Sequence, residues 1–135
     1  MRWVIDGNNV FGSRPDGWWN DRPAAQRRFT QRVAEWCRTH TDDVTLVFDA
    51  PLGRDTAMLA GGNLAVVEAT RRGRNAADDE IVELVDRLLD DGSDDADDAD
   101  DATIRVVTSD RGLRARLPPH VEIVGVGHFR DLVRY

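Results

Sequence analysis

The stretch WVIDGNNVFGSRPDGWW, residues 3–19, joins a short apolar run to a polar segment that holds an acid, two asparagines and two tryptophans. The apolar run WVID has the composition of a buried strand, and the residues after it predict a loop. Four further runs rich in valine and isoleucine follow along the chain: VTLVFD, LAVVEA, TIRVVTSD and VEIVGV. We therefore expect a sheet of about five strands that begins with WVID.

Helical patterns separate these runs. Asp21 and Pro23 are typical of a helix start, and the apolar face that follows comprises Phe29, Val33, Trp36 and Cys37. A second helix is predicted from about Asn75, with the core face Ile81, Leu84, Val85, Leu88 and Leu89. Short helices are expected after Asp110 and across residues 128–133. Strands that alternate with helices indicate an α/β fold with a mainly parallel sheet.

The acidic residues are unevenly distributed over the chain. It has 135 residues, the length of one domain, and a formal net charge of −7. Eight of the 25 acids lie in DDGSDDADDADD, residues 90–101, a run too poor in apolar residues to fold, so we predict a flexible acidic insertion at about 90–102. Without this run the chain is nearly neutral, and a local basic patch is compatible with its charge.

The cysteine content and hydropathy bear on the compartment. One cysteine cannot form an internal disulfide, and the first residues lack the pattern of a signal peptide. No apolar run approaches the roughly 20 residues that cross a bilayer. We expect a cytoplasmic protein without a membrane partner.

Aspartates stand at the carboxyl ends of three predicted strands: Asp6 in WVID, Asp49 in VTLVFD and Asp110 in TIRVVTSD. In a parallel sheet these ends share one edge, where ligands bind. Helical spacing turns Asp78, in the first turn of the second helix, towards the sheet and Asp79 towards solvent or the lip of a cleft. Each acid alone is also a good helix cap or turn residue.

Several carboxylates at one edge would repel one another unless a cation lay between them. The oxygen donors on offer, which include the Asn9 amide and the Thr108 and Ser109 hydroxyls, favour Mg²⁺ or Mn²⁺. Zinc is disfavoured, because the three histidines lack ligand spacing and Cys37 lies on a core face. No residue stands in a context typical of a protein nucleophile, so the expected nucleophile is water activated by the metal.

Four ordered motifs carry a family resemblance: VIDGNNVFGSRPDGWW, LVFDAP, RNAADDEIVELV and VVTSDRGLRARL. Together they resemble the NYN domains, in the YacP-like branch of the PIN-like nuclease superfamily, over nearly the whole chain except the acidic insertion. The resemblance implies a three-layer α/β sandwich with helices on both faces of the sheet. It also implies a metal-dependent ribonuclease with a site of clustered acids.

By motif, the resemblance assigns catalytic positions to Asp6, to Asp78 and Asp79, and to Asp110. Of these, Asp6, Asp78 and Asp110 are the expected metal ligands. Asn9 matches the asparagine that accompanies the first acid, and the other supporting residues are Asp49, Thr108 and Ser109. Related nucleases often carry another acid one helical turn after the third, where this chain has Arg114. The number of ions, one or two, therefore stays open.

RNA, single-stranded or structured, is the expected partner. Guanidinium groups bind phosphate well and tryptophans stack on unpaired bases, and the candidates are Arg14, Arg71, Arg72, Arg74, Trp18 and Trp19. A solvated arginine run and a loop anchored by tryptophans are the structural alternatives. Two other functions fit the same residues: a non-catalytic RNA-binding NYN module and a metal-dependent nucleotide phosphohydrolase. The sequence leaves open the oligomeric state, the RNA substrate and the choice between internal and terminal cutting.

Overall fold

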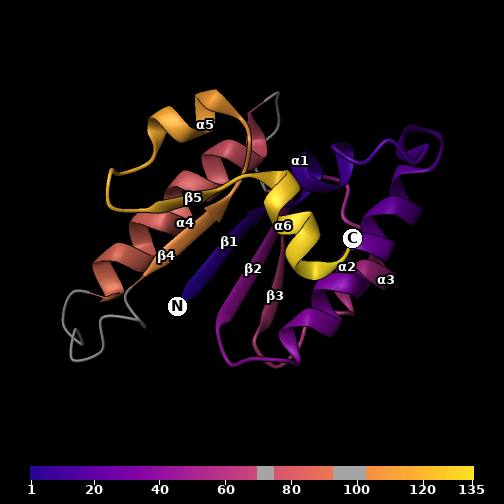
Figure 1. The fold of residues 1–135 in the computed structure, drawn as a ribbon, viewed down its shortest axis with the longest axis horizontal. Helices are drawn as coiled ribbons and strands as arrows, with labels where there is room; N and C mark the ends of the chain where they lie inside the picture. The colour runs from indigo at the N-terminus through magenta and orange to yellow at the C-terminus, as the bar shows by residue number, and fades with distance from the viewer. Residues whose placement is uncertain (70–74, 93–102) are drawn as a thin grey trace.

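A parallel sheet of five strands forms the centre of the molecule in the computed structural model, which describes residues 1–69, 75–92 and 103–135. The sheet has the order β3-β2-β1-β4-β5, and every neighbouring pair is parallel (Figure 1). The strands are β1 (Arg2–Asp6), β2 (Asp43–Phe48), β3 (Leu64–Glu68), β4 (Ile104–Val107) and β5 (Glu122–Val124). The predicted sheet of about five strands is confirmed.

The described residues form six α-helices, of which five lie between strands and the last follows β5. They are α1 (Gly7–Gly12), α2 (Arg22–Cys37), α3 (Arg54–Ala57), α4 (Ala76–Gly92), α5 (Arg111–Arg116) and α6 (Val126–Val133). The Asp21 carboxylate caps α2 by accepting a hydrogen bond from the Ala24 N–H, as the sequence predicts. None of the helices in the described part of the chain has the length and apolar character needed to cross a bilayer.

Two expectations about local structure are wrong. The segment after β1 is not a loop, because α1 begins at Gly7 directly after the strand, and a short 3-10 helix follows at Trp18–Asn20. Glycine and asparagine are poor helix formers, so burial of Val10 and Phe11 against the sheet decides this helix. In addition, α4 continues to Gly92, so the first residues assigned to the acidic insertion are helical. Residues 93–102 lie outside the described part of the chain.

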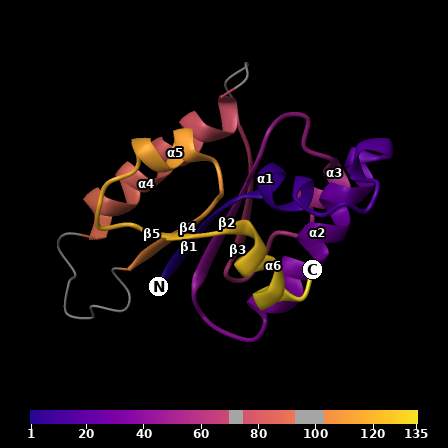
Figure 2. The same ribbon diagram turned by 45° about the horizontal axis from the view of Figure 1, so that its top comes forward.

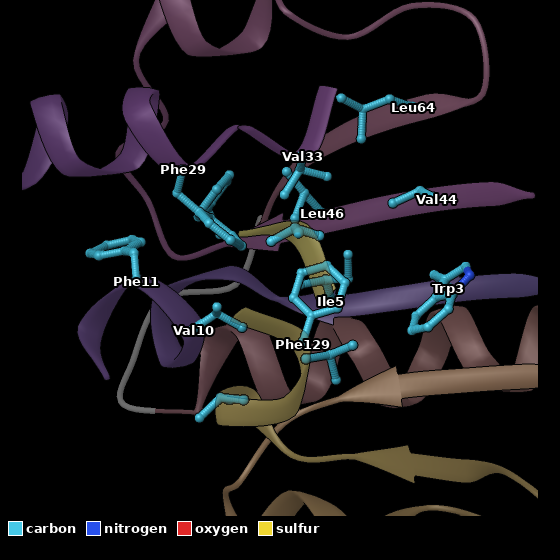
Figure 3. Packing of buried hydrophobic residues seen from close by; sticks show 14 of the residues in the cluster. Trp3, Ile5, Val10, Phe11, Phe29, Val33, Val44, Leu46, Leu64 and Phe129 are labelled. Atoms are coloured by element: carbon cyan, nitrogen blue, oxygen red, sulfur yellow. The ribbon is translucent and has the colours of Figure 1, made fainter. Parts of the chain in front are cut away.

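Helices cover both faces of the sheet, as predicted for a three-layer sandwich. In Figure 2, α4 and α5 lie on one side of the sheet, and α1, α2 and α6 lie on the other. The side chains alternate accordingly along β1: Trp3 and Ile5 belong to the core beneath α1, α2 and α6, whereas Val4 belongs to the core beneath α4. Figure 3 shows the first core, which includes Ile5 of β1 and the neighbouring rings of Phe29 of α2 and Phe129 of α6.

The carboxyl ends of the three central strands meet at one edge of the sheet. Asp6 is level with Val47 of β2, and Ile5 is level with Val107 of β4. Asp49 and Asp110 therefore follow strands that end beside Asp6. Figure 1 shows α1 and the first turn of α4 at this same edge. Residues that are far apart in the sequence are thereby brought together.

Gly7 is required by the close approach of α1 to β2. A Cβ atom at this position would overlap the Phe48 ring, which is fully buried. We expect Gly7→Ala to lower the free energy of unfolding by about 1–3 kcal/mol, the usual cost of an overpacked core. Urea unfolding measures this change. Gly127→Ala is the matched control, because a Cβ there meets no atom within 4 Å and alanine favours the helix. Equal stability of the two variants would contradict the prediction.

Candidate active site

A cleft of about 410 Å³ lies at the carboxyl edge of the sheet. Four of the predicted acids line it, and they come from four different segments: Asp6, Asp49, Asp78 and Asp110. The other lining residues are Asn8, Asn9, Phe11, Trp18, Arg22, Asn75 and Ala77. The structure thus brings together residues that are separated by up to about a hundred positions.

Asp6 is the most deeply buried of the four acids. Its side chain is 5% exposed, and its Oδ2 atom accepts a hydrogen bond of 3.0 Å from the Thr108 hydroxyl. Burial raises the pKa of the Asp6 carboxyl from 3.8 to about 7, and the Asp78, Asp49 and Asp110 carboxylates add to this rise, whereas the Thr108 bond opposes it. Near neutral pH, Asp6 can therefore either hold a proton or carry a charge.

Asp110 is held in place by the start of α5. Its Oδ1 atom accepts from the Leu113 N–H at 3.1 Å, which is the predicted helix cap. The Asp110 N–H in turn donates to the Thr108 hydroxyl at 3.1 Å. Thr108, which is fully buried, therefore links the acid at the end of β1 to the acid after β4.

The two asparagines of α1 reach to opposite sides of β1. Asn8 Oδ1 accepts from the Asp49 N–H at 2.8 Å, and Asn9 Oδ1 accepts from the Ser109 N–H at 2.9 Å. The Ser109 hydroxyl accepts from the Val126 N–H at the start of α6. These bonds set the spacing of the segments after β2 and β4, and hence of the acids that those segments carry.

The first turn of α4 closes the cleft. Asp49 Oδ1 accepts from the Ala77 N–H at 3.2 Å, which fixes this turn against the end of β2. Burial raises the pKa of Asp78, and the Asp110, Asp49 and Asp79 carboxylates add to this rise, while Arg116 opposes it. Asp79 does not line the cleft and instead pairs with Arg116 of α5 at 2.8 Å. Its predicted orientation, away from the sheet, agrees with this position.

The donor set of the cleft fits a hard divalent cation. Four carboxylate residues line one cavity, and mutual repulsion of the acids contributes to the raised pKa values of Asp6 and Asp78. Within residues 1–69, 75–92 and 103–135, no three Asp, Glu, His or Cys side chains form a group able to hold a metal ion by themselves. Mg²⁺ commonly binds through one or two carboxylates and keeps several waters, so the arrangement suits an ion that is held partly through water.

The predicted RNA-binding residues are distributed unevenly. Trp18 lines the cleft and packs edge-on against Phe11 and Trp19, whereas Trp19 is 60% exposed and does not line it. Arg14 lies 3.7 Å from the Asp16 carboxylate and over the Tyr135 ring, and it is not among the residues that line the cleft. Three predicted arginines lie outside the described residues: Arg71, Arg72 and Arg74.

Sequence reasoning missed five residues that line the cleft, of which three are polar: Asn8, Arg22 and Asn75. Arg22 stands at the start of α2, with its guanidinium 5.9 Å from the centre of the Trp18 ring. The sequence indicates its position only through the helix start predicted at Pro23, because α2 begins near the edge of the sheet that holds the acids. Asn8 could have been found through DGNN, where only the second asparagine was assigned a role.

The strand order, the parallel connections and the helices on both faces give this chain an α/β sandwich fold of the PIN-like type. No protein-family model matches the chain, and no curated protein does. Among solved structures, the match to a single-site mutant of Rae1 (YacP) from Bacillus subtilis has a TM-score of 0.71 and 20% identity, and covers 98% of this chain and 74% of that one.

A second crystal structure of Rae1 (YacP) from Bacillus subtilis matches with a TM-score of 0.69 and 20% identity, over 99% of this chain and 74% of that one. A mutant of the T5 5′-exonuclease matches with a TM-score of 0.50 and 14% identity, over 99% of this chain and 55% of that one. The chain therefore has the fold of a YacP-like NYN domain, in agreement with the resemblance of its sequence motifs.

Proposed function

We propose that this protein is a metal-dependent ribonuclease that hydrolyses phosphodiester bonds in the cleft at the carboxyl edge of the sheet. The observation that carries the proposal is the approach of four carboxylates, from four segments, to one cavity that also contains an arginine. If the four acids served only as helix caps, they would not need to lie in one cleft. Repulsion between neighbouring carboxylates lowers the stability of the native state.

Asp6, Asp78 and Asp110 are the proposed ligands of Mg²⁺ or Mn²⁺, directly or through water. When bound, the ion would supply positive charge that stabilises the negative charge developing on the phosphate oxygens and would make water a stronger nucleophile. Asp110 is kept in position by the Leu113 N–H, and Asp6 by the Thr108 hydroxyl. Their second carboxylate oxygens accept neither of these bonds, so each acid has an oxygen available for the ion or its waters.

Other residues are proposed to hold the substrate and its waters. Arg22 is placed to contact a phosphate of the RNA, because guanidinium groups form paired hydrogen bonds to phosphate oxygens. Trp18 offers the cleft an aromatic ring on which an unpaired base can stack. Asn9 and Ser109 keep the segment before Asp110 in register. Asp49, which lines the cleft, is the better candidate to accept a proton from water, since Asp79 lies outside the cleft and is paired with Arg116.

The fold supports a nuclease, since its structural neighbours include a protein named as a 5′-exonuclease. An incubation with labelled single-stranded RNA and, separately, with nucleoside triphosphates tests the proposal in Mg²⁺, in Mn²⁺ and in chelator. We expect the RNA to be shortened with either metal, to stay intact in chelator, and the triphosphates to remain unchanged.

Two outcomes would replace the proposal. Intact RNA whose migration is retarded by the protein would identify a non-catalytic RNA-binding module. Hydrolysis of nucleoside triphosphates without cleavage of RNA would identify a nucleotide phosphohydrolase.

A further inference from the structure

A second cavity, of about 310 Å³, adjoins the acidic cleft. It lies between α1, α2 and the segment after β2, and it shares Asn8, Phe11, Arg22 and Asp49 with the cleft. Because four residues line both spaces, one ligand can extend from the carboxylates into the second cavity. Its volume is at the lower end of the roughly 300–1,000 Å³ typical of small-molecule sites, which suits a group the size of a nucleobase.

The walls of this cavity are mainly apolar. Pro23 and Pro51 supply exposed ring surfaces, the buried Phe11 lines the inner wall, and Ala50 lies at the exposed rim. Flat apolar surfaces of this kind bind unpaired nucleobases, which have a π-face whatever their sequence. The charged atoms lie on the side shared with the cleft, where Arg22 can bind a phosphate.

Two side-chain amides also line the cavity: that of Gln26, which is buried, and that of Asn8, which is half-buried. Gln26 is 5% exposed, and its Oε1 atom accepts from the Gly53 N–H at 3.2 Å. Asn8 likewise uses its Oδ1 atom, in the bond from the Asp49 N–H. In both residues the bond from the backbone N–H uses the amide oxygen and not the NH₂ group, and both residues line the cavity. The cavity therefore offers donors, which match the carbonyl oxygens and ring nitrogens at the edges of nucleobases.

We propose that this cavity is a nucleobase subsite, which takes the unpaired base of a nucleotide whose phosphate lies beside Arg22 at the acidic cleft. The inference rests on the proposed function and deepens it, since it assigns the substrate class as single-stranded nucleic acid with an unstacked base. A paired base cannot enter, because its face and edge are occupied by its neighbours in the duplex.

The test compares two nucleotides with a sugar phosphate that lacks the base. Adenosine and uridine 5′-monophosphates and ribose 5-phosphate are titrated into the wild-type protein with Mg²⁺, and their affinities are measured by calorimetry or NMR. One stacked base contributes about 1–3 kcal/mol, so we expect the nucleotides to bind about tenfold more tightly than ribose 5-phosphate. Equal affinities in the wild-type protein would overturn the proposal without any variant.

A blocking variant locates the site. Ala50→Trp places an indole at the rim of the cavity, and we expect it to reduce nucleotide affinity to that of ribose 5-phosphate while the affinity of ribose 5-phosphate itself is kept. Ala60→Trp is the matched control, because Ala60 is also exposed and lines neither cavity. A tenfold preference that survives in Ala50→Trp, with thermal unfolding unchanged, would overturn the proposal.

The same proteins, incubated with RNA, separate this inference from the proposed function. Preference for nucleotides without cleavage of RNA supports the subsite and contradicts the ribonuclease. Cleavage of RNA without any preference for nucleotides over ribose 5-phosphate contradicts the subsite and supports the ribonuclease.

Discussion

Asp78→Asn is expected to lower metal-dependent cleavage of single-stranded RNA by about 100-fold to 1,000-fold. Asp78 lines the cleft from the first turn of α4, where its carboxylate is close enough to Asp110 and Asp49 for their charges to raise its pKa. A bound ion would stabilise the charge on the phosphate oxygens in the transition state by several kcal/mol. Each 1.36 kcal/mol corresponds to a tenfold change in rate. The amide of asparagine keeps the size of the side chain and removes its charge.

The control for this substitution lies on the same helix. Asp86→Asn also removes one negative charge from α4, but Asp86 is exposed and does not line the cleft. We expect it to cleave RNA at the wild-type rate. Initial rates of cleavage, measured over a range of Mn²⁺ concentrations, compare the three proteins. Wild-type rates in Asp78→Asn at every concentration would contradict the role of Asp78 as a ligand.

Asp6→Asn is expected to make the protein more stable above pH 7, although it should also impair cleavage. The pKa of Asp6 rises from 3.8 to about 7 in the native state. The native state therefore binds more protons than the unfolded state between about pH 4 and pH 7, so the free energy of unfolding of the wild-type protein falls as the pH rises through this window. Asparagine does not titrate, and its Oδ1 atom can still accept from Thr108.

The difference in stability should grow with pH and then level off. Each tenfold change in proton affinity corresponds to about 1.4 kcal/mol, so we expect Asp6→Asn to exceed the wild-type protein by on the order of 2–4 kcal/mol at pH 8 and to match it near pH 4. Urea unfolding in chelator at several pH values measures this. Asp131→Asn, at an exposed position of α6, should show no such trend. Lower stability of Asp6→Asn than of the wild-type protein at pH 8 would contradict the prediction.

The sheet could be predicted because buried parallel strands have a clear sequence pattern. Runs such as WVID and VTLVFD are mostly apolar, as expected where both faces of the sheet are covered. Once the strands are parallel, the positions of Asp6, Asp49 and Asp110 at one edge follow from connectivity alone. The long helices α2 and α4 were recognised for a similar reason, since their apolar residues repeat at helical spacing.

The details of the cleft depend on tertiary contacts that leave little trace in the sequence. Helix α1 has six residues and begins Gly-Asn-Asn, so its formation is decided by packing of Val10 and Phe11. The partner of Asp79 is Arg116, which lies on a different helix and has no pattern in common with it. Gln26 occupies a buried position of α2 where periodicity predicts an apolar residue, and its Oε1 atom accepts a bond from the Gly53 N–H on a distant segment.

The asparagine bonds of α1 also have a consequence for the order of events in folding. They join Asn8 to Asp49 and Asn9 to Ser109, over 41 and 100 positions along the chain. Contacts between residues so far apart in the sequence form after local structure, because closing long loops costs conformational entropy. The acids consequently become neighbours only once β2 and β4 flank β1, and repulsion between them acts on the finished native state. Removing one of these charges should therefore slow unfolding and leave the folding rate nearly unchanged.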